Sequence, residues 1–71
     1  MLETLLEILS WDLPAPEIIL EQDGCLGLEW YHEGGSIYDI SIFPNGHVAW
    51  AVSEPRRHGT DLKEFQRMVS T

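Results

Sequence analysis

The chain has 71 residues, which predicts one small domain over residues 1–71, and its composition excludes several classes of protein. Apolar residues make up 44% of the chain and include three tryptophans. This content is enough for a packed core and argues against a disordered tail. The formal net charge is −8. Residues 1–55 carry ten carboxylates and no Lys or Arg, because all four basic side chains lie in residues 56–71. Nucleic-acid binding depends on cationic side chains, so direct DNA or RNA binding is not expected.

The compartment follows from what the chain lacks. No apolar run approaches the roughly 20 residues of a membrane span. The first residues, Met1-Leu2-Glu3, lack the basic region of a secretory signal, and the single cysteine, Cys25, cannot form an internal disulfide. These features predict a cytoplasmic protein that does not associate with membranes.

Residues 2–10 are predicted to form an amphipathic helix. Its apolar residues recur at i, i+3, i+4 and i+7, with glutamates on the opposite side: Leu2, Leu5, Leu6 and Leu9. The Pro14-Ala15-Pro16 segment ends any helix and is interpreted as a stiff connector. Docking of this Pro-x-Pro segment into an aromatic-lined groove is the alternative.

Residues 17–53 are predicted to form a four-stranded antiparallel meander. Asp23-Gly24, Gly34-Gly35 and Asn45-Gly46 are dipeptides that accept the positive φ angles of tight hairpin turns. The runs between them alternate apolar and polar residues with a period of two, as a sheet with one buried face does. The expected strands are residues 17–22, 25–33, 36–43 and 47–53.

The C-terminal part is predicted to form a basic loop and a second helix. Arg56-Arg57-His58-Gly59 supplies the loop, and Thr60 is the expected N-cap of a helix over residues 61–70. That helix has one apolar stripe, formed by Leu62, Phe65, Met68 and Val69. The predicted fold is therefore α+β, in the order α-β-β-β-β-α. Both helices are expected to cover the sheet face that carries Leu28, Trp30, Ile40, Trp50 and Val52.

The register across Gly34-Gly35 decides which carboxylates meet. A two-residue turn would put Glu29 opposite Ile40, on the wrong face for the observed alternation. A bulge or a longer loop would instead bring Glu29 and Asp39 together on one face.

No residue pattern indicates catalysis, a metal or a cofactor, so a non-catalytic protein is expected. His32, His47 and His58 lack the spacing of metal ligands and are interpreted as solvated residues. The acidic setting of Cys25 is expected to raise the pKa of its thiol, which disfavours a nucleophile.

The open face of the sheet is the candidate site. It is expected to mix acidic and large apolar side chains on exposed strands, as protein-binding patches do. The predicted protein-binding residues are Glu29, Tyr31, Ile37, Asp39 and Phe43. The alternative is that Ile37 and Phe43 are covered by a helix or by a second copy.

Residues 13–52 resemble a group of small bacterial proteins. The resemblance rests on Leu13-Pro14-Ala15-Pro16, on the Asp23-Gly24 turn, on Leu28-Glu29-Trp30, and on the hairpin containing Ile40-Ser41-Ile42 and Gly46-His47-Val48. It implies an antiparallel α+β fold and no particular activity.

The leading hypothesis is an acidic, non-catalytic interaction module of a bacterium or phage that binds a basic protein surface. One concrete form is an inhibitor of a nucleic-acid-binding defence complex, similar to an anti-CRISPR protein. A homo-oligomeric structural domain, such as a homodimer, is one alternative. A small-molecule binder or enzyme using Tyr31, Tyr38 or the histidines is the other, and it requires a pocket of at least about 300 Å³ lined by those groups.

Overall fold

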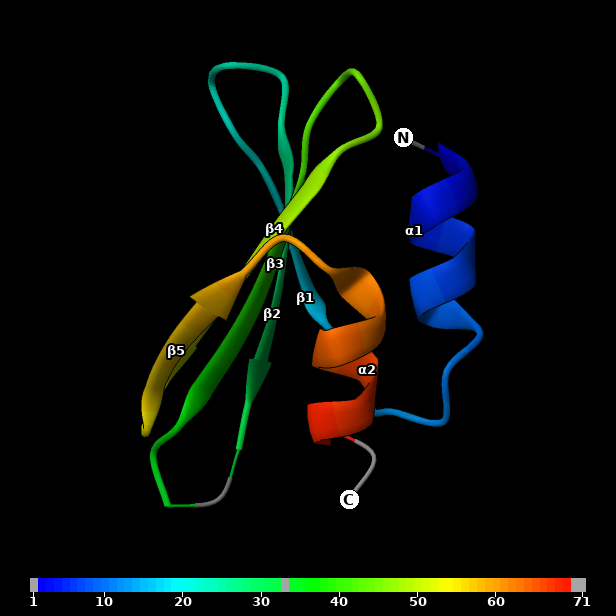
Figure 1. Cartoon of the computed structure of the whole chain (residues 1–71). Coiled ribbons are helices and arrows are strands. Elements are labelled where there is room, and N and C mark those ends of the chain that lie inside the picture. The colour runs from blue at the N-terminus through cyan, green and yellow to red at the C-terminus, as the bar shows by residue number, and fades with distance from the viewer. Residues whose placement is uncertain (1, 33, 70–71) are drawn as a thin grey trace.

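The computed structural model describes residues 2–32 and 34–69 and shows an α+β fold. Five antiparallel strands lie side by side in sequence order, as β1-β2-β3-β4-β5. The elements are α1 (Leu2–Leu9), β1 (Glu17–Leu20), β2 (Leu26–Tyr31), β3 (Ile37–Ile42), β4 (Val48–Ser53), β5 (Arg56–Gly59) and α2 (Leu62–Val69). Figure 1 shows both helices on the same side of the twisted sheet. The other face of the sheet, here called the open face, carries no helix formed by the described residues.

The first three hairpins have loops of the same length, although Gly34 in the middle of the second loop also has a positive φ, of 89°. In each hairpin, the two residues of the last hydrogen-bonded pair are separated by three loop residues. The N–H groups of Glu21, His32 and Phe43 donate to the carbonyls of Cys25, Ser36 and His47, respectively. The glycine that ends each loop has a positive φ of 86° to 90°, as the three-residue hairpin loop requires. Asp23 and Asn45 do not adopt positive φ: their side-chain oxygens instead accept the N–H two residues on.

This loop length decides the register between β2 and β3. Three intervening residues place Glu29 opposite Asp39 and Leu28 opposite Ile40. The longer-loop alternative is therefore confirmed, and the two-residue register is wrong. Glu29 and Asp39 share the open face, while Leu28 and Ile40 share the buried one.

The predicted basic loop after β4 is wrong, because residues 56–59 form a fifth strand. Ser53 pairs with Arg56 across Glu54 and Pro55, which are joined by a cis peptide bond, and Trp50 pairs with Gly59. A Cβ on Gly59 would lie 2.7 Å from Cζ2 of Trp50. Gly59 therefore leaves the space in which the buried indole of Trp50 lies against β5.

The core lies between the sheet and the helices. Its buried residues are Ile8, Leu28, Ile40, Ile42, Trp50, Val52 and Phe65. Phe65 of α2 is fully buried, and its ring centroid lies 5.7–6.3 Å from those of Trp11, Trp30, Tyr38 and Trp50. One α2 side chain thus joins the helix, the lead-in to β1 and three strands.

Asp61, and not the predicted Thr60, caps α2. Its Oδ1 atom accepts the N–H of Lys63 at 3.0 Å, and its carbonyl accepts the N–H of Phe65. The Trp50 indole also donates to this carbonyl, at 3.0 Å. The cap is therefore fixed to the sheet as well as to the helix. The predicted end of this helix at residue 70 lies outside the described residues.

The buried side of α1 is not the predicted one but is rotated from it by part of a helical turn. Ile8 is its buried residue and Leu5 packs beside it, whereas Leu2, Leu6 and Leu9 are exposed. The helix ends at Leu9, where the Ser10 N–H still bonds to Leu6. In the described part of the chain, no helix is long and apolar enough to cross a membrane.

Candidate protein-binding face and adjoining cavity

A row of acidic side chains crosses the open face. The register places Glu17 of β1 opposite Glu29 of β2, and Glu29 opposite Asp39 of β3. The next positions in this row are Ala51 and His58. Three carboxylates thus follow one another on adjacent strands, where side chains directly opposite lie about 4.5–5.5 Å apart at Cβ.

A fourth carboxylate joins this row from the end of β1. A Cβ placed on Gly27 would lie 3.0 Å from Oε1 of Glu21, so the carboxylate of Glu21 lies over this glycine. We call Glu17, Glu21, Glu29 and Asp39 the acidic row. Like charges directly opposite one another destabilise a sheet, so the row has an energetic cost.

The electrostatics of Asp39 reflect this crowding. Burial first, and then the charges of Glu29 and Glu21, raise the pKa of its carboxyl above the ordinary value. All three causes act against the charged form, as expected where like charges are partly withdrawn from water. A cation placed over the row would relieve this unfavourable interaction.

Tyr31 extends the acidic row at one end. Its hydroxyl donates to Oε2 of Glu29 at 3.2 Å, and the residue is 64% exposed. The charges of Glu29 and then Glu17 raise the pKa of this phenol. Both carboxylates are therefore close enough to the Tyr31 hydroxyl to act on it.

Four of the five predicted binding residues lie together, and one does not. Glu29, Tyr31, Ile37 and Asp39 occupy the open face of β2 and β3, with Ile37 directly opposite Tyr31. Phe43 follows β3, is half-buried, and lines a depression together with Thr4 and Glu7 of α1. It is therefore separated from the other four.

Sequence reasoning missed Glu17 and Glu21 as members of the row. The first strand contains three consecutive apolar residues, Ile18, Ile19 and Leu20, which hide its alternation. Counting across the Asp23-Gly24 hairpin with a three-residue loop would have placed Glu17 opposite Glu29.

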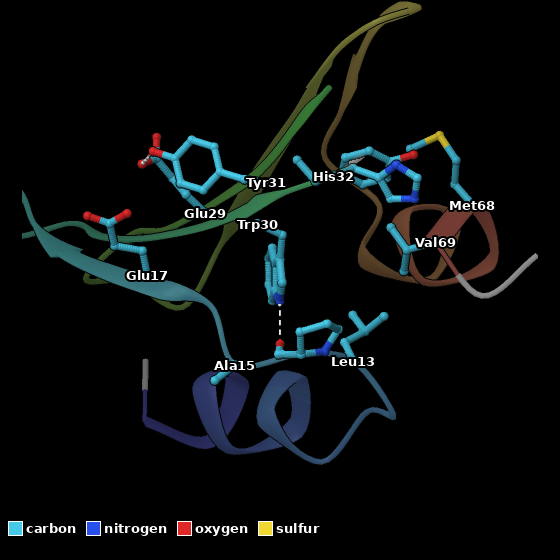
Figure 2. Close-up of a pocket in the computed structure, with 11 residues that line it drawn as sticks. Leu13, Ala15, Glu17, Glu29, Trp30, Tyr31, His32, Met68 and Val69 are labelled. Atoms are coloured by element: carbon cyan, nitrogen blue, oxygen red, sulfur yellow. Dashed lines mark hydrogen bonds between the residues drawn. The ribbon is translucent and has the colours of Figure 1, made fainter. Parts of the chain in front are cut away.

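A cavity of about 580 Å³ adjoins the acidic row where β1 begins. Glu17 pairs with Glu29, so Trp30 and Tyr31 of β2 extend past the start of β1. Figure 2 shows Glu17, Glu29 and Tyr31 on one side of this strand end, with Trp30 pointing the other way toward the lead-in segment. The Trp30 indole donates to the Pro14 carbonyl at 2.8 Å.

The far side of the cavity is formed by α2 and by aromatic side chains. His32 and Tyr38 stack with their ring centroids 5.8 Å apart, and Met68 and Val69 lie beside them. The cavity therefore has the size and the tyrosine and histidine lining that the small-molecule hypothesis requires. His32 is exposed, as predicted, and so are His47 and His58, although His58 lies in β5 and not in a loop.

Glu21, Asp23 and Cys25 form a further cluster, whose ligand atoms all lie within 4.8 Å of one another. The hairpin loop brings them together, since Oδ1 of Asp23 accepts the Cys25 N–H at 3.1 Å. This bond lowers the pKa of the Asp23 carboxyl. Burial, followed by the interaction with the Asp23 side chain as hydrogen-bond acceptor and by the charges of Asp23 and Glu21, raises the pKa of the Cys25 thiol to about 11. This increase is in the direction predicted from the acidic setting of Cys25. A thiol that stays protonated is a poor nucleophile and a poor metal ligand.

Comparison of the chain with protein-family models, with curated proteins and with solved structures found no match. The resemblance of residues 13–52 to a group of small bacterial proteins therefore stays a prediction.

Proposed function

We propose that this protein is a non-catalytic, acidic interaction module that binds a basic surface of another protein through its open face. The observation that carries the proposal is the acidic row, in which Glu29 has a carboxylate neighbour on each side. Such a row costs stability in the isolated chain and gains a favourable partner when a cationic surface covers it.

Two further features support an interaction surface. Tyr31 and Ile37 are exposed beside the row, and large apolar groups next to charge are common in protein-binding patches. The net charge of −8 would also accelerate association with a basic partner at low ionic strength. The concrete partner that we propose is a nucleic-acid-binding protein of a defence complex. The module would inhibit this complex, as a phage anti-CRISPR protein does.

The test is a comparison of two charge-matched baits. Glu29→Gln/Asp39→Asn removes two charges from the acidic row, and Glu3→Gln/Asp12→Asn removes two charges elsewhere. Each bait and the wild type are used to capture proteins from bacterial lysate at low and at moderate salt, and bound proteins are identified by mass spectrometry.

The proposal expects one basic protein that the wild type and the control bait retain, that the row variant loses, and that higher salt releases. Equal retention by all three baits, or retention that is independent of salt, would show that the acidic row is not the binding surface.

Two other functions have a structural feature in their favour. The exposed apolar residues of β1, at the edge of the sheet, favour a homo-oligomer formed by edge pairing. Sedimentation that shows only monomer at high concentration would remove this candidate. The cavity beside the acidic row favours a small-molecule binder. Its shape and charge also permit a more specific proposal.

A further inference from the structure

The cavity where β1 begins combines three properties that bear on the kind of ligand it would take. It is about 580 Å³ in volume, within the usual range for ligand pockets. It has aromatic walls, and it has two carboxylates, those of Glu17 and Glu29. Among the described residues that line it, none is Lys or Arg. These properties together favour a ligand that is both cationic and able to pack on aromatic rings.

The arrangement of the lining residues gives the cavity two parts. Its acidic part consists of the paired Glu17 and Glu29 and of the Tyr31 ring, whose hydroxyl is bonded to Glu29. Its less polar part lies around Trp30 and Ala15, on the other side of the strand end (Figure 2), where Pro14 accepts the hydrogen bond of the Trp30 indole. An elongated group with a charged head and an apolar stem matches this division.

Arginine fits better than lysine. Its planar guanidinium stacks on aromatic rings and donates hydrogen bonds in a fixed fork, which two neighbouring carboxylates can accept. A lysine ammonium is a compact, strongly hydrated charge that gains less from a planar ring.

We propose that this cavity receives one arginine side chain of the basic partner, with the guanidinium at Glu17, Glu29 and Tyr31 and the stem along Pro14, Ala15 and Trp30. The inference rests on the proposed function for the source of the arginine. The cavity itself can be tested with a peptide. The raised pKa of Tyr31 supports the geometry, because it places the fields of both carboxylates at the phenol.

The experiment titrates the full chain with three acetylated alanine-based pentapeptides that differ only in their central residue: arginine, lysine or citrulline. Citrulline keeps the shape of arginine and lacks its charge. The readout is the NMR signal of the Trp30 indole N–H, which is assigned by its loss in Trp30→Phe. Binding of the arginine peptide is expected to shift this signal saturably, with citrulline at least about tenfold weaker and lysine about threefold weaker.

Variants then locate the site. Glu17→Gln, at an exposed position, is expected to weaken the arginine peptide about threefold to fivefold. Glu3→Gln, at an exposed position of α1, removes a carboxylate that belongs neither to the acidic row nor to the cavity lining, and it is expected to leave peptide affinity within about twofold. Equal affinity for the arginine and citrulline peptides, equal affinity for lysine, or no effect of Glu17→Gln would each overturn the proposal.

The two proposals fail in different ways. If no peptide shifts the Trp30 signal while Asp39→Asn weakens capture of a basic protein, the arginine cavity is wrong and the module stands. If the arginine peptide binds as described and no basic protein depends on the row, the module is wrong and the cavity stands.

Discussion

Replacing Asp39 with asparagine is expected to stabilise the protein at neutral pH. Asp39 lies on the central strand β3, with Glu29 on one side and Ala51 on the other. Its carboxyl is partly buried, and its raised pKa has only unfavourable causes: burial and the charges of Glu29 and Glu21. Asparagine has nearly the same shape and carries no charge, so it removes the repulsion and keeps the packing.

The magnitude follows from the geometry. A pair of like charges directly across two antiparallel strands costs about 0.2–1 kcal/mol, and Glu21 adds a longer-range contribution. We therefore expect the free energy of unfolding to rise by about 0.5–1 kcal/mol at pH 7 and low salt. For a domain of this size, that increase corresponds to about 2–8 °C in Tm.

The sign of the pH dependence is opposite to that of an ordinary ion-paired carboxyl. Because the pKa of Asp39 is raised in the folded state, the native protein retains this proton to a higher pH than the unfolded chain does. Its contribution is therefore least unfavourable at low pH. Stability is lost as pH rises from the ordinary pKa to the raised one, and above it the cost is constant. The advantage of Asp39→Asn should grow through this interval and then level off.

The assay is urea unfolding of wild type and variant from pH 3 to pH 8, at low and at high salt. Asp12→Asn, at an exposed position, is the matched control and should change stability by less than about 0.5 kcal/mol. High salt should reduce the gain at Asp39. An Asp39→Asn variant less stable than wild type at pH 7, or a gain that does not change with pH, would refute the electrostatic argument.

Three other predictions concern the core and the thiol. Phe65→Ala should lower the free energy of unfolding by about 3–5 kcal/mol, because this ring contacts four aromatic side chains. Phe65→Leu should lose less than half of that amount, and both losses are measured by urea unfolding; equal losses would contradict the packing argument. Gly59→Ala should lower the free energy of unfolding by about 1–3 kcal/mol and change the near-UV circular dichroism of Trp50, since the new Cβ would lie 2.7 Å from the indole. An unchanged spectrum and an unchanged stability would show that β5 can move away from the indole without cost. The Cys25 thiol should react with iodoacetamide at pH 8 about 100-fold more slowly in the folded than in the urea-unfolded protein, given its raised pKa of about 11; similar rates would show that the thiol is not protected.

The meander was predictable because its signals are local. Asp23, Asn45 and the glycines that follow them mark the loops, and the strands between them alternate with a period of two. The loop length was not predictable from these dipeptides alone, because they suit both two- and three-residue loops. Only the buried partners, Leu28 with Ile40, decide between the two registers.

What sequence reasoning missed depends on contacts between distant segments. The strand β5 has no apolar side chain, so it carries no strand pattern of its own and forms by pairing with β4. The four leucines and Ile8 of α1 lie around much of the helix, so its sequence is compatible with more than one buried side. Contacts with the rest of the chain decide which side is buried. The cavity joins residues of the lead-in, of β2 and of α2, which no local pattern relates.

At the outer edge of β1, the acidic residues of this chain have a second physical effect. In the part of the chain that the structure describes, no strand pairs with that edge, and Ile18, Ile19 and Leu20 are all exposed along it. An unpaired edge with three consecutive bulky apolar residues is a template for uncontrolled growth from one molecule to the next. Glu17 and Glu21 flank this run directly and act as gatekeepers, since two edges that approach each other bring their carboxylates together. The same charges that would attract a basic partner would therefore also oppose edge pairing between two copies, which weighs against the homo-oligomer, and a partner that neutralises them would also have to cover this edge.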